Sequence, residues 1–172
     1  PVQHACLGNI LSKRDLVVQA KTGSGKTAAF GIPLIHQLND AEPSEAGHPK
    51  ALVLTPTREL CLQVGRQLST FAGEGGVRVG CLYGGGSMRN QIGLLEDGLH
   101  VAVCTVGRMM DHIRRGHLHL DAVETLILDE ADEMLSMGFW DDVVAVFEKT
   151  PQEKQVLLFS ATLPYQVASA AS

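Results

Sequence analysis

The chain has 172 residues, of which 45% are hydrophobic, and it carries a formal net charge of −5. This composition excludes a disordered chain and favours a single domain that buries a substantial core. It also excludes a broad basic surface, so any contact with nucleic acid must come from a few placed groups. No apolar run approaches the roughly 20 residues of a membrane-spanning helix, and the first residues lack the pattern of a signal peptide.

Runs of apolar and β-branched residues alternate along the chain with helical patterns. Strands are expected at residues 16–20, 51–55, 77–83, 101–105, 125–129 and 156–160. Helices are expected at residues 26–38, 58–71, 87–95, 107–115 and 140–149. Most of the strand runs are continuously apolar, which is typical of strands covered on both faces. The alternation predicts an α/β fold with a mostly parallel sheet and helices on both faces.

The stretch from Ala20 to Thr27 reads AKTGSGKT and joins an expected strand to an expected helix. This is the setting of a phosphate-binding loop, in which glycines let backbone N–H groups and a helix N-terminus face one anion. Lys26 can reach the β- and γ-phosphates of a nucleotide, and Thr27 can offer its hydroxyl to Mg²⁺. The alternative is a glycine-rich turn that only caps a helix. The residues expected to bind the nucleotide here are Ala20, Thr22, Gly23, Ser24, Gly25, Lys26 and Thr27.

The stretch LILDEADEML, at residues 126–135, places a run of acids at the end of a buried strand. Burying charge is costly unless a cation or a reacting group compensates it. A nucleotide-bound Mg²⁺ would supply that charge, with Asp129 and Thr27 holding the metal and Glu130 orienting or deprotonating the attacking water. Asp129, Glu130 and Lys26 are therefore the candidate catalytic residues. The alternative is a solvated turn in which an aspartate caps the next helix, and for Asp132 that capping role stays open.

Further short motifs follow in order along the chain. They are Pro56-Thr57-Arg58-Glu59-Leu60 with Gln63, Gly84-Gly85 with Gln91 and Gly98, Thr105-Val106-Gly107-Arg108, and Ser160-Ala161-Thr162. Together with Gln3, the phosphate loop and the acid run that spells DEAD, they resemble the motifs of the N-terminal RecA-like domain of DEAD-box ATP-dependent RNA helicases of superfamily 2. The resemblance covers nearly the whole chain. It departs at Val106, where the family has proline, and this would soften the bend at Gly107 and Arg108.

The resemblance implies roles around the nucleotide. Gln3 would read the adenine edge of ATP, as the glutamine of the family's Q motif does. Asp132, Ser160 and Thr162 would couple the nucleotide state to work on RNA, with Ser160 and Thr162 hydrogen-bonding to the acids of the DEAD run. The plainer alternative is that the two hydroxyls only end a strand and form an ordinary turn.

The resemblance also implies contacts with the sugar–phosphate backbone of one RNA strand, which carry no sequence information. The residues that would make them are Pro56, Thr57, Arg58, Gly85, Thr105, Gly107 and Arg108. Thr57 is also suited to cap the following helix, and both roles can hold together. Arg108 has the alternative of being only a surface charge.

Residues 1–172 are accordingly expected to form the first of two RecA-like domains, beginning within the Q motif, with the second domain outside the chain. In the family the second domain supplies arginines that reach the γ-phosphate, and such an arginine is worth roughly 10³ to 10⁵ in rate. We therefore expect the chain to bind ATP and Mg²⁺, to hydrolyse ATP poorly and to bind RNA weakly on its own. Joined to its second domain it would couple ATP hydrolysis to local RNA duplex unwinding or ribonucleoprotein remodelling. An ATP-gated RNA clamp that does not unwind is the alternative, and a DNA-directed motor is a third possibility.

Cysteines and histidines are the remaining candidate metal ligands. The cysteines show no paired metal spacing and are expected to be free thiols of an intracellular protein in a reducing compartment. They are Cys6, Cys61, Cys81 and Cys104. His112, His117 and His119 offer too few ligands for a zinc site, and we expect them in a polar loop after the helix at residues 107–115.

Overall fold

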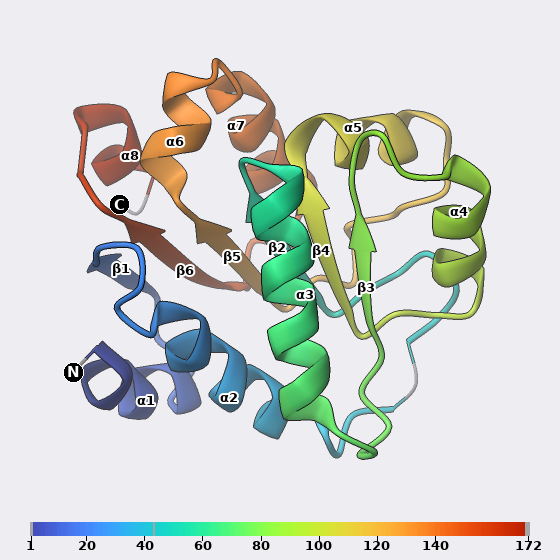
Figure 1. Ribbon diagram of the computed structural model, residues 1–172, viewed down its shortest axis with the longest axis horizontal. Helices are drawn as coiled ribbons and strands as arrows, with labels where there is room; N and C mark the ends of the chain where they lie inside the picture. The colour runs from blue at the N-terminus through green and yellow to red at the C-terminus, as the bar shows by residue number, and fades with distance from the viewer. Residues whose placement is uncertain (1, 43, 171–172) are drawn as a thin grey trace.

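The computed structural model describes residues 2–42 and 44–170, whose strands form one sheet of six parallel strands (Figure 1). Across the sheet the order is β1-β6-β5-β2-β4-β3, and every neighbouring pair runs parallel. The strands are β1 (Leu16–Gln19), β2 (Ala51–Thr55), β3 (Val79–Leu82), β4 (Val101–Thr105), β5 (Thr125–Asp129) and β6 (Gln155–Ser160). The predicted α/β class and all the expected strands are therefore confirmed, with small differences at their ends.

Helices lie on both faces of the sheet, as the alternation predicts. They are α1 (Val2–Leu11), α2 (Lys26–Leu38), α3 (Arg58–Ala72), α4 (Met88–Glu96), α5 (Val106–Arg114), α6 (Ala131–Ser136), α7 (Trp140–Lys149) and α8 (Tyr165–Ser169). The helices α2, α3, α4, α5 and α7 match the expected ones to within a residue at either end. None of these helices is long and apolar enough to cross a membrane.

The sheet separates two hydrophobic cores, one on each face, because successive side chains of a strand point to opposite sides. In β2, Leu52 and Leu54 join the core formed with α4 to α8, whereas Ala51 and Val53 join the core formed with α1, α2 and α3. The second core includes a tilted aromatic pair, Phe30 with Phe159, whose ring centroids lie 5.2 Å apart. In Figure 1, α3 crosses in front of the strands, and α1 packs against α2 beside it.

The register brings the ends of the central strands to one level of the sheet. Gln19 of β1 lies opposite Ser160 of β6, and Asp129 of β5 lies opposite Phe159 of β6. In an open parallel sheet the loops after the carboxyl ends of the strands gather the ligand. The phosphate loop, the acid run and the turn after β6 therefore meet at one edge of the sheet.

Candidate functional site

The phosphate loop connects β1 to α2, and its start is tied to the neighbouring strand. The Ala20 amide donates to the carbonyl of Ser160 at 3.0 Å. Gly23 and Gly25 both have φ of 79°, in the left-handed region that favours glycine. Helix α2 then begins at Lys26, whose side chain is buried. The loop therefore curls back over the start of a helix, as anion binding requires.

Gln3 reaches this loop from α1. Its Nε2 donates to the carbonyl of Gly25 at 3.4 Å. A Cβ at Gly25 would lie 2.7 Å from the same Nε2, so a larger residue there would displace the end of the Gln3 side chain from the loop. Gln3, far from the loop in sequence, thus belongs to the same corner.

The acid run converges on the phosphate loop through Lys26. Its Nζ lies 3.0 Å from Asp129 Oδ1 and 3.4 Å from Glu130 Oε1. The Thr22 hydroxyl also approaches Glu130 Oε1, at 3.5 Å. The two motifs singled out in the sequence therefore form one site.

Asp129 is the most deeply buried acid of this site, with 0% of its surface exposed. Its Oδ1 faces Lys26 at ion-pair distance but forms no well-aligned hydrogen bond, and no hydrogen-bond donor among the described residues reaches Oδ2. Burial raises the pKa of Asp129, and Lys26 opposes that rise only in part. A buried carboxylate oxygen without a partner fits a ligand of Mg²⁺, which prefers such oxygens.

Glu130 follows in an unusual backbone conformation. Its φ of 55° and ψ of 52° lie in the left-handed region. Among the described non-glycine residues, Lys13 is the only other one with a positive φ. For an L-residue this conformation costs roughly 1–2 kcal/mol. Strained residues of this kind are concentrated at functional sites. Here Glu130 directly precedes α6, and its carboxylate lies near Lys26 and Thr22.

A hollow of about 460 Å³ opens beside these groups. It is lined by Thr22, Gly23, Gly25, Lys26, Thr27, Ala28, Thr57, Glu59, Leu60, Gln63, Gln67 and Glu130. Lys26 is the one basic side chain in that lining, so a polyanion placed here has a single cationic partner from the described residues.

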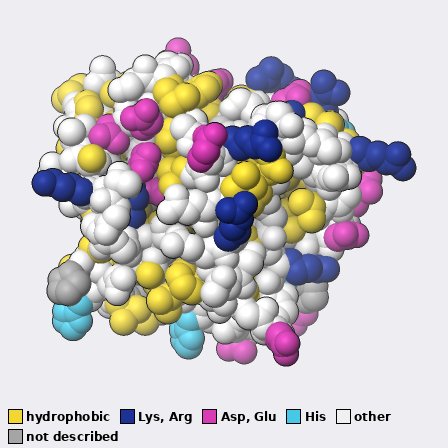
Figure 2. All heavy atoms as spheres, in the orientation of Figure 1, with side chains coloured by type: hydrophobic (Ala, Val, Ile, Leu, Met, Phe, Trp, Pro, Cys, Tyr) yellow, Lys and Arg dark blue, Asp and Glu magenta, His cyan; other side chains and the backbone are white. Residues whose placement is uncertain are grey.

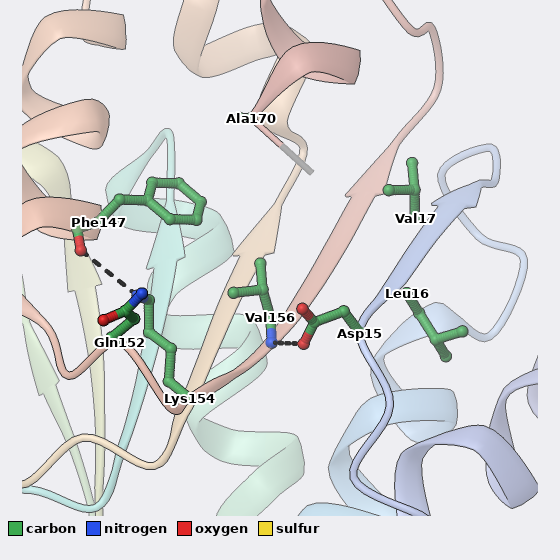
Figure 3. A pocket seen from close by; sticks show the side chains of 8 residues that line it. All are labelled: Asp15, Leu16, Val17, Phe147, Gln152, Lys154, Val156 and Ala170. Carbon is green, nitrogen blue, oxygen red and sulfur yellow. Dashed lines mark hydrogen bonds between the residues drawn. The ribbon is translucent and has the colours of Figure 1, made fainter. Parts of the chain in front are cut away.

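A second hollow, of about 230 Å³, lies between the start of β1, β6 and α7 (Figure 3). Its two charged side chains, Lys154 and Asp15, are already engaged. Lys154 Nζ donates to the carbonyls of Pro151 at 3.0 Å and Phe147 at 3.4 Å, and Asp15 Oδ1 accepts from the Val156 amide at 2.7 Å. Because these charged groups are already bonded, this hollow does not offer a charged side chain to a ligand as the hollow beside Lys26 does. We therefore assign the ligand to the larger hollow beside Lys26.

The turn after β6 is joined to the acid run by Asp132. Its Oδ2 accepts from the Thr162 amide at 3.1 Å and from the Thr162 hydroxyl at 2.9 Å. The Asp132 amide donates to Ser160 Oγ at 3.1 Å. Burial alone would raise the pKa of Asp132, but hydrogen bonds with the hydroxyls of Thr162 and Ser160 and with the backbone amides of Thr162 and Glu133 together hold that pKa below its usual value. These side chains do more than end a strand, because they link two loops of the site.

The motif at residues 56–60 builds the start of α3. Thr57 caps this helix by accepting from the Leu60 amide at 3.2 Å, as its alternative role predicted. Pro56 is buried beside it. Arg58 is exposed and lies over the ring of Tyr83, 5.0 Å from the centroid. Figure 2 shows Lys and Arg side chains over α3 and toward α4 and α5, while acidic side chains gather in the upper left, where α6 lies.

The motif at residues 105–108 begins α5. This helix starts at Val106, with Thr105 as its N-cap residue but without a side-chain capping bond, and Gly107 is exposed. Arg108 is half-buried and donates from Nη1 to the carbonyl of Gly86 at 3.0 Å and to Gln91 Oε1 at 3.2 Å. Arg108 is therefore not an isolated surface charge.

The placement expected for the histidines was wrong for His112, which lies inside α5 and is fully buried. Its Nε2 contacts Gln91 Oε1 at 2.9 Å, and its Nδ1 contacts His117 Nδ1 at 3.2 Å. Within residues 2–42 and 44–170, no group of His, Cys, Asp and Glu side chains is arranged to hold a metal ion. Sequence reasoning missed this contact network; its one signal was a helical pattern that already included residue 112.

A parallel α/β sheet with a glycine-rich phosphate loop, a lysine at the start of the next helix and a strand-terminal aspartate defines a RecA-like P-loop nucleotide-binding domain. Residues 1–170 match the DEAD/DEAH box helicase family model. The chain belongs to the DEAD/DEAH box helicase family.

Curated relatives and solved structures agree with this placement. The chain is 46% identical over 164 residues to the ATP-dependent RNA helicase CshA of Listeria monocytogenes, covering 95% of this chain and 31% of that protein. It is 47% identical over 165 residues to the ATP-dependent RNA helicase DeaD of Haemophilus influenzae, covering 95% and 26%. The crystal structure of a DEAD box protein from Methanococcus jannaschii matches with a TM-score of 0.90 at 42% identity, covering 99% of this chain and 46% of that one. The chain thus spans between about a quarter and a third of the length of these curated relatives.

Proposed function

We propose that this chain binds ATP with Mg²⁺ and is the first RecA-like domain of an ATP-dependent RNA helicase. In that protein, ATP binding and hydrolysis would be coupled to local RNA duplex unwinding or ribonucleoprotein remodelling. The observation that carries the proposal is the meeting of Lys26 with Asp129 and Glu130, where a buried carboxylate has an oxygen without a partner. The names of the relatives, which are ATP-dependent RNA helicases, support it.

The nucleotide would replace the contacts that Lys26 now makes with the acids. Lys26 would move to the β- and γ-phosphates, where the backbone N–H groups of the loop and the start of α2 add partial positive charge. Asp129 and the hydroxyl of Thr27 would hold Mg²⁺, which supplies positive charge to the phosphate oxygens. Glu130, released from Lys26, would orient the attacking water and accept its proton. Gln3, already at the loop, would contact the adenine.

The RNA would lie along the start of α3, the turn after β3 and the start of α5. Donors there are the Thr57 and Thr105 hydroxyls, the guanidinium of Arg58 and backbone N–H groups near Gly85 and Gly107. Basic side chains over this part of the surface in Figure 2 support a backbone-binding role. Because the net charge is −5, binding by this chain should be weak, with a shallow salt dependence of about 0.7 in log–log slope per phosphate.

A second RecA-like domain would complete the nucleotide site. No arginine of the described chain lines the hollow beside Lys26, whereas related NTPases gain roughly 10³ to 10⁵ in rate from such a residue. The greater length of the relatives leaves room for that domain. Asp132, Ser160 and Thr162, which already bond to one another, would transmit the nucleotide state to the RNA surface. The free cysteines, Cys6, Cys61, Cys81 and Cys104, support an intracellular, reducing compartment.

The test is ATP hydrolysis and strand displacement by the chain joined to its second domain. Stimulation of hydrolysis by single-stranded RNA, together with displacement of a short RNA duplex, is the expected result. Persistent ATP-dependent RNA binding without displacement would favour the non-unwinding clamp. Stimulation by DNA in preference to RNA would favour a DNA-directed motor, and loss of ATP binding would overturn the proposal.

A further inference from the structure

The Gly84–Gly86 turn after β3 is surrounded by polar side chains from three helices. Arg58 of α3 lies on one side, close enough that a Cβ at Gly85 would be 3.1 Å from its Nη1. Arg108 of α5 lies on another side and donates to the Gly86 carbonyl at 3.0 Å. Gln91 of α4 completes the enclosure and donates from Nε2 to the carbonyl of Tyr83 at 2.9 Å.

Gln91 is the centre of this cluster, since its side chain is buried and its amide oxygen is shared. Only 3% of Gln91 is exposed. Its Oε1 receives Arg108 Nη1 at 3.2 Å and His112 Nε2 at 2.9 Å. A buried amide that donates to one segment and accepts from another fixes the two segments relative to each other. Here the segments are the turn after β3 and helix α5.

The contacts also determine where the proton of His112 lies. Because Gln91 Oε1 can only accept, His112 Nε2 must carry the hydrogen, and Nδ1 is then left to accept from His117 Nδ1 at 3.2 Å. Burial, with help from the nearby charges of His117 and Arg108, lowers the pKa of His112 to about 4. His112 is therefore neutral at pH 7, as this pattern of donors and acceptors requires.

The turn packs closely against Gln91 and Tyr83. A Cβ at Gly86 would lie 2.8 Å from Gln91 Nε2 and 2.6 Å from a ring atom of Tyr83. Gly85 has φ of 79°, which a residue with a side chain adopts only with strain. The turn is therefore both conformationally specific and packed directly on the cluster.

We propose that Gln91, Arg108 and His112 are positioning residues that lock the Gly84–Gly86 turn and the start of α5 into one rigid unit, which holds the backbone of one RNA strand. This inference rests on the proposed RNA-binding function. Preorganised backbone donors bind without an ordering cost, so the cluster strengthens binding without touching RNA. Arg108 then acts chiefly through Gly86 and Gln91, although its sequence motif suggested a phosphate contact.

The two roles of Arg108 predict different behaviour. A phosphate ligand acts through charge, so Arg108→Lys would largely keep the affinity and Arg108→Gln would lower the salt slope by about 0.7. A positioning residue acts through its forked geometry, so lysine cannot replace it and the salt slope stays unchanged. Gln91→Leu carries no charge change and tests the cluster independently.

The test is titration of the chain with single-stranded decauridylate, at several salt concentrations, followed by NMR of the Gly84, Gly85 and Gly107 amides. We expect Gln91→Leu and Arg108→Lys each to weaken binding about tenfold, with unchanged salt slope. Hydrogen exchange at the turn and at the start of α5 should rise together in both variants. Retained ATP affinity in these variants would show that the fold is intact.

Matched controls are the exposed residues Gln166 of α8 and Arg114 of α5. Gln166→Leu and Arg114→Gln should leave hydrogen exchange at the turn unchanged. The inference is overturned if Gln91→Leu binds RNA like the unaltered chain, or if Arg108→Lys keeps full affinity while Arg108→Gln lowers the slope. A chain that binds ATP but shows no RNA binding even before substitution would instead overturn the proposed function, and the inference with it.

Discussion

The nucleotide corner and the turn after β3 both lie beyond the carboxyl ends of the strands. Each is built around one buried polar side chain. At the nucleotide corner this is Asp129, a carboxylate with one oxygen facing Lys26 and the other without a partner among the described residues. At the turn it is Gln91, an amide whose oxygen accepts twice and whose nitrogen donates once. The nucleotide corner leaves a buried carboxylate oxygen without a hydrogen-bond partner, whereas the turn after β3 satisfies its buried amide within the chain.

The two corners are suited to different kinds of binding. A buried carboxylate oxygen without a hydrogen-bond partner is costly, and a ligand that supplies the missing partner gains that free energy on binding. A satisfied buried amide gains nothing from a ligand, but it keeps a surface rigid before the ligand arrives. The first arrangement suits a cation-bound nucleotide that comes and goes, and the second suits a backbone that must meet fixed donors.

Removing the reactive acid of the nucleotide corner, Glu130, should change the activity most. Glu130→Gln should lower ATP hydrolysis by about 10² to 10⁴-fold, because an amide cannot accept a proton from water. ATP binding should be retained, since Gln keeps the shape of the side chain. Single-turnover hydrolysis with bound ATP measures this in the chain joined to its second domain. Glu133→Gln, at an exposed position of α6, is the control, and an unchanged rate for Glu130→Gln would remove the catalytic role.

A second prediction tests whether the hydrogen bonds around Gln91 require neutral His112. The pKa of His112 is lowered to about 4, so between the unfolded value of 6.5 and 4 the unfolded chain binds a proton that the folded chain refuses. Stability should therefore fall as pH drops through that window, by at most about 3 kcal/mol from this residue. Urea unfolding at a series of pH values measures the slope.

The matched variants for that slope are His112→Gln and, at an exposed position of α2, His36→Gln. The first should flatten the fall between pH 6.5 and 4, and the second should leave the contribution of His112 in place. Equal slopes in all three proteins would mean that His112 is protonated as readily when folded as when unfolded.

A third prediction sets stability against function at Asp129. The raised pKa of Asp129 means that the fold favours its neutral form, and Asn imitates that form. Asp129→Asn should therefore raise the Tm of the nucleotide-free chain, because Asn buries no charge. The same variant should lose the added Tm that Mg²⁺ and ATP give together. A lower Tm without nucleotide would show that the ion pair with Lys26 outweighs burial; exposed Asp40→Asn is the control.

The smallest effect concerns the link between the two loops at Asp132. Hydrogen bonds hold the pKa of Asp132 below its usual value, so they contribute stability above the unfolded value of 3.8, and this contribution is lost as pH falls through the lower folded value. Thr162→Val should remove about 0.5 kcal/mol at pH 7, since the pair is partly solvated. Unfolding measurements at pH 7 and at acid pH should show a smaller loss for the variant than for the unaltered chain. An equal loss would mean that the contact is not maintained in solution.

Much of the fold could be predicted because its signals are local. The continuous apolar runs of β2, β4 and β5 marked buried strands, and parallel pairing then required that the phosphate loop and the acids meet at one edge. The same reasoning places Lys26 and Asp129 at one nucleotide site. The helices α1, α6 and α8 were not predicted: α6 and α8 have only six and five residues, and α1 buries only Cys6 and Ile10.

The cluster at Gln91 could not be predicted because its partners come from separate segments. Nothing in the sequence around residue 91 indicates that the side chain is buried, and the carbonyls that it and Arg108 satisfy belong to a turn. His112 occupies a helical position that is polar by residue type and buried by packing. Hydrogen bonds of this kind follow from how helices α4 and α5 pack on the sheet, which short motifs do not encode.

The left-handed backbone at Glu130 has a consequence for evolution and engineering. A glycine would occupy that position with no steric penalty, so Glu130→Gly should relieve most of the roughly 1–2 kcal/mol of local strain while removing the carboxylate. Selection for thermal robustness alone would thus drive this position away from glutamate. Variant libraries selected only for heat tolerance should therefore accumulate glycine at position 130 and yield more stable proteins that do not hydrolyse ATP.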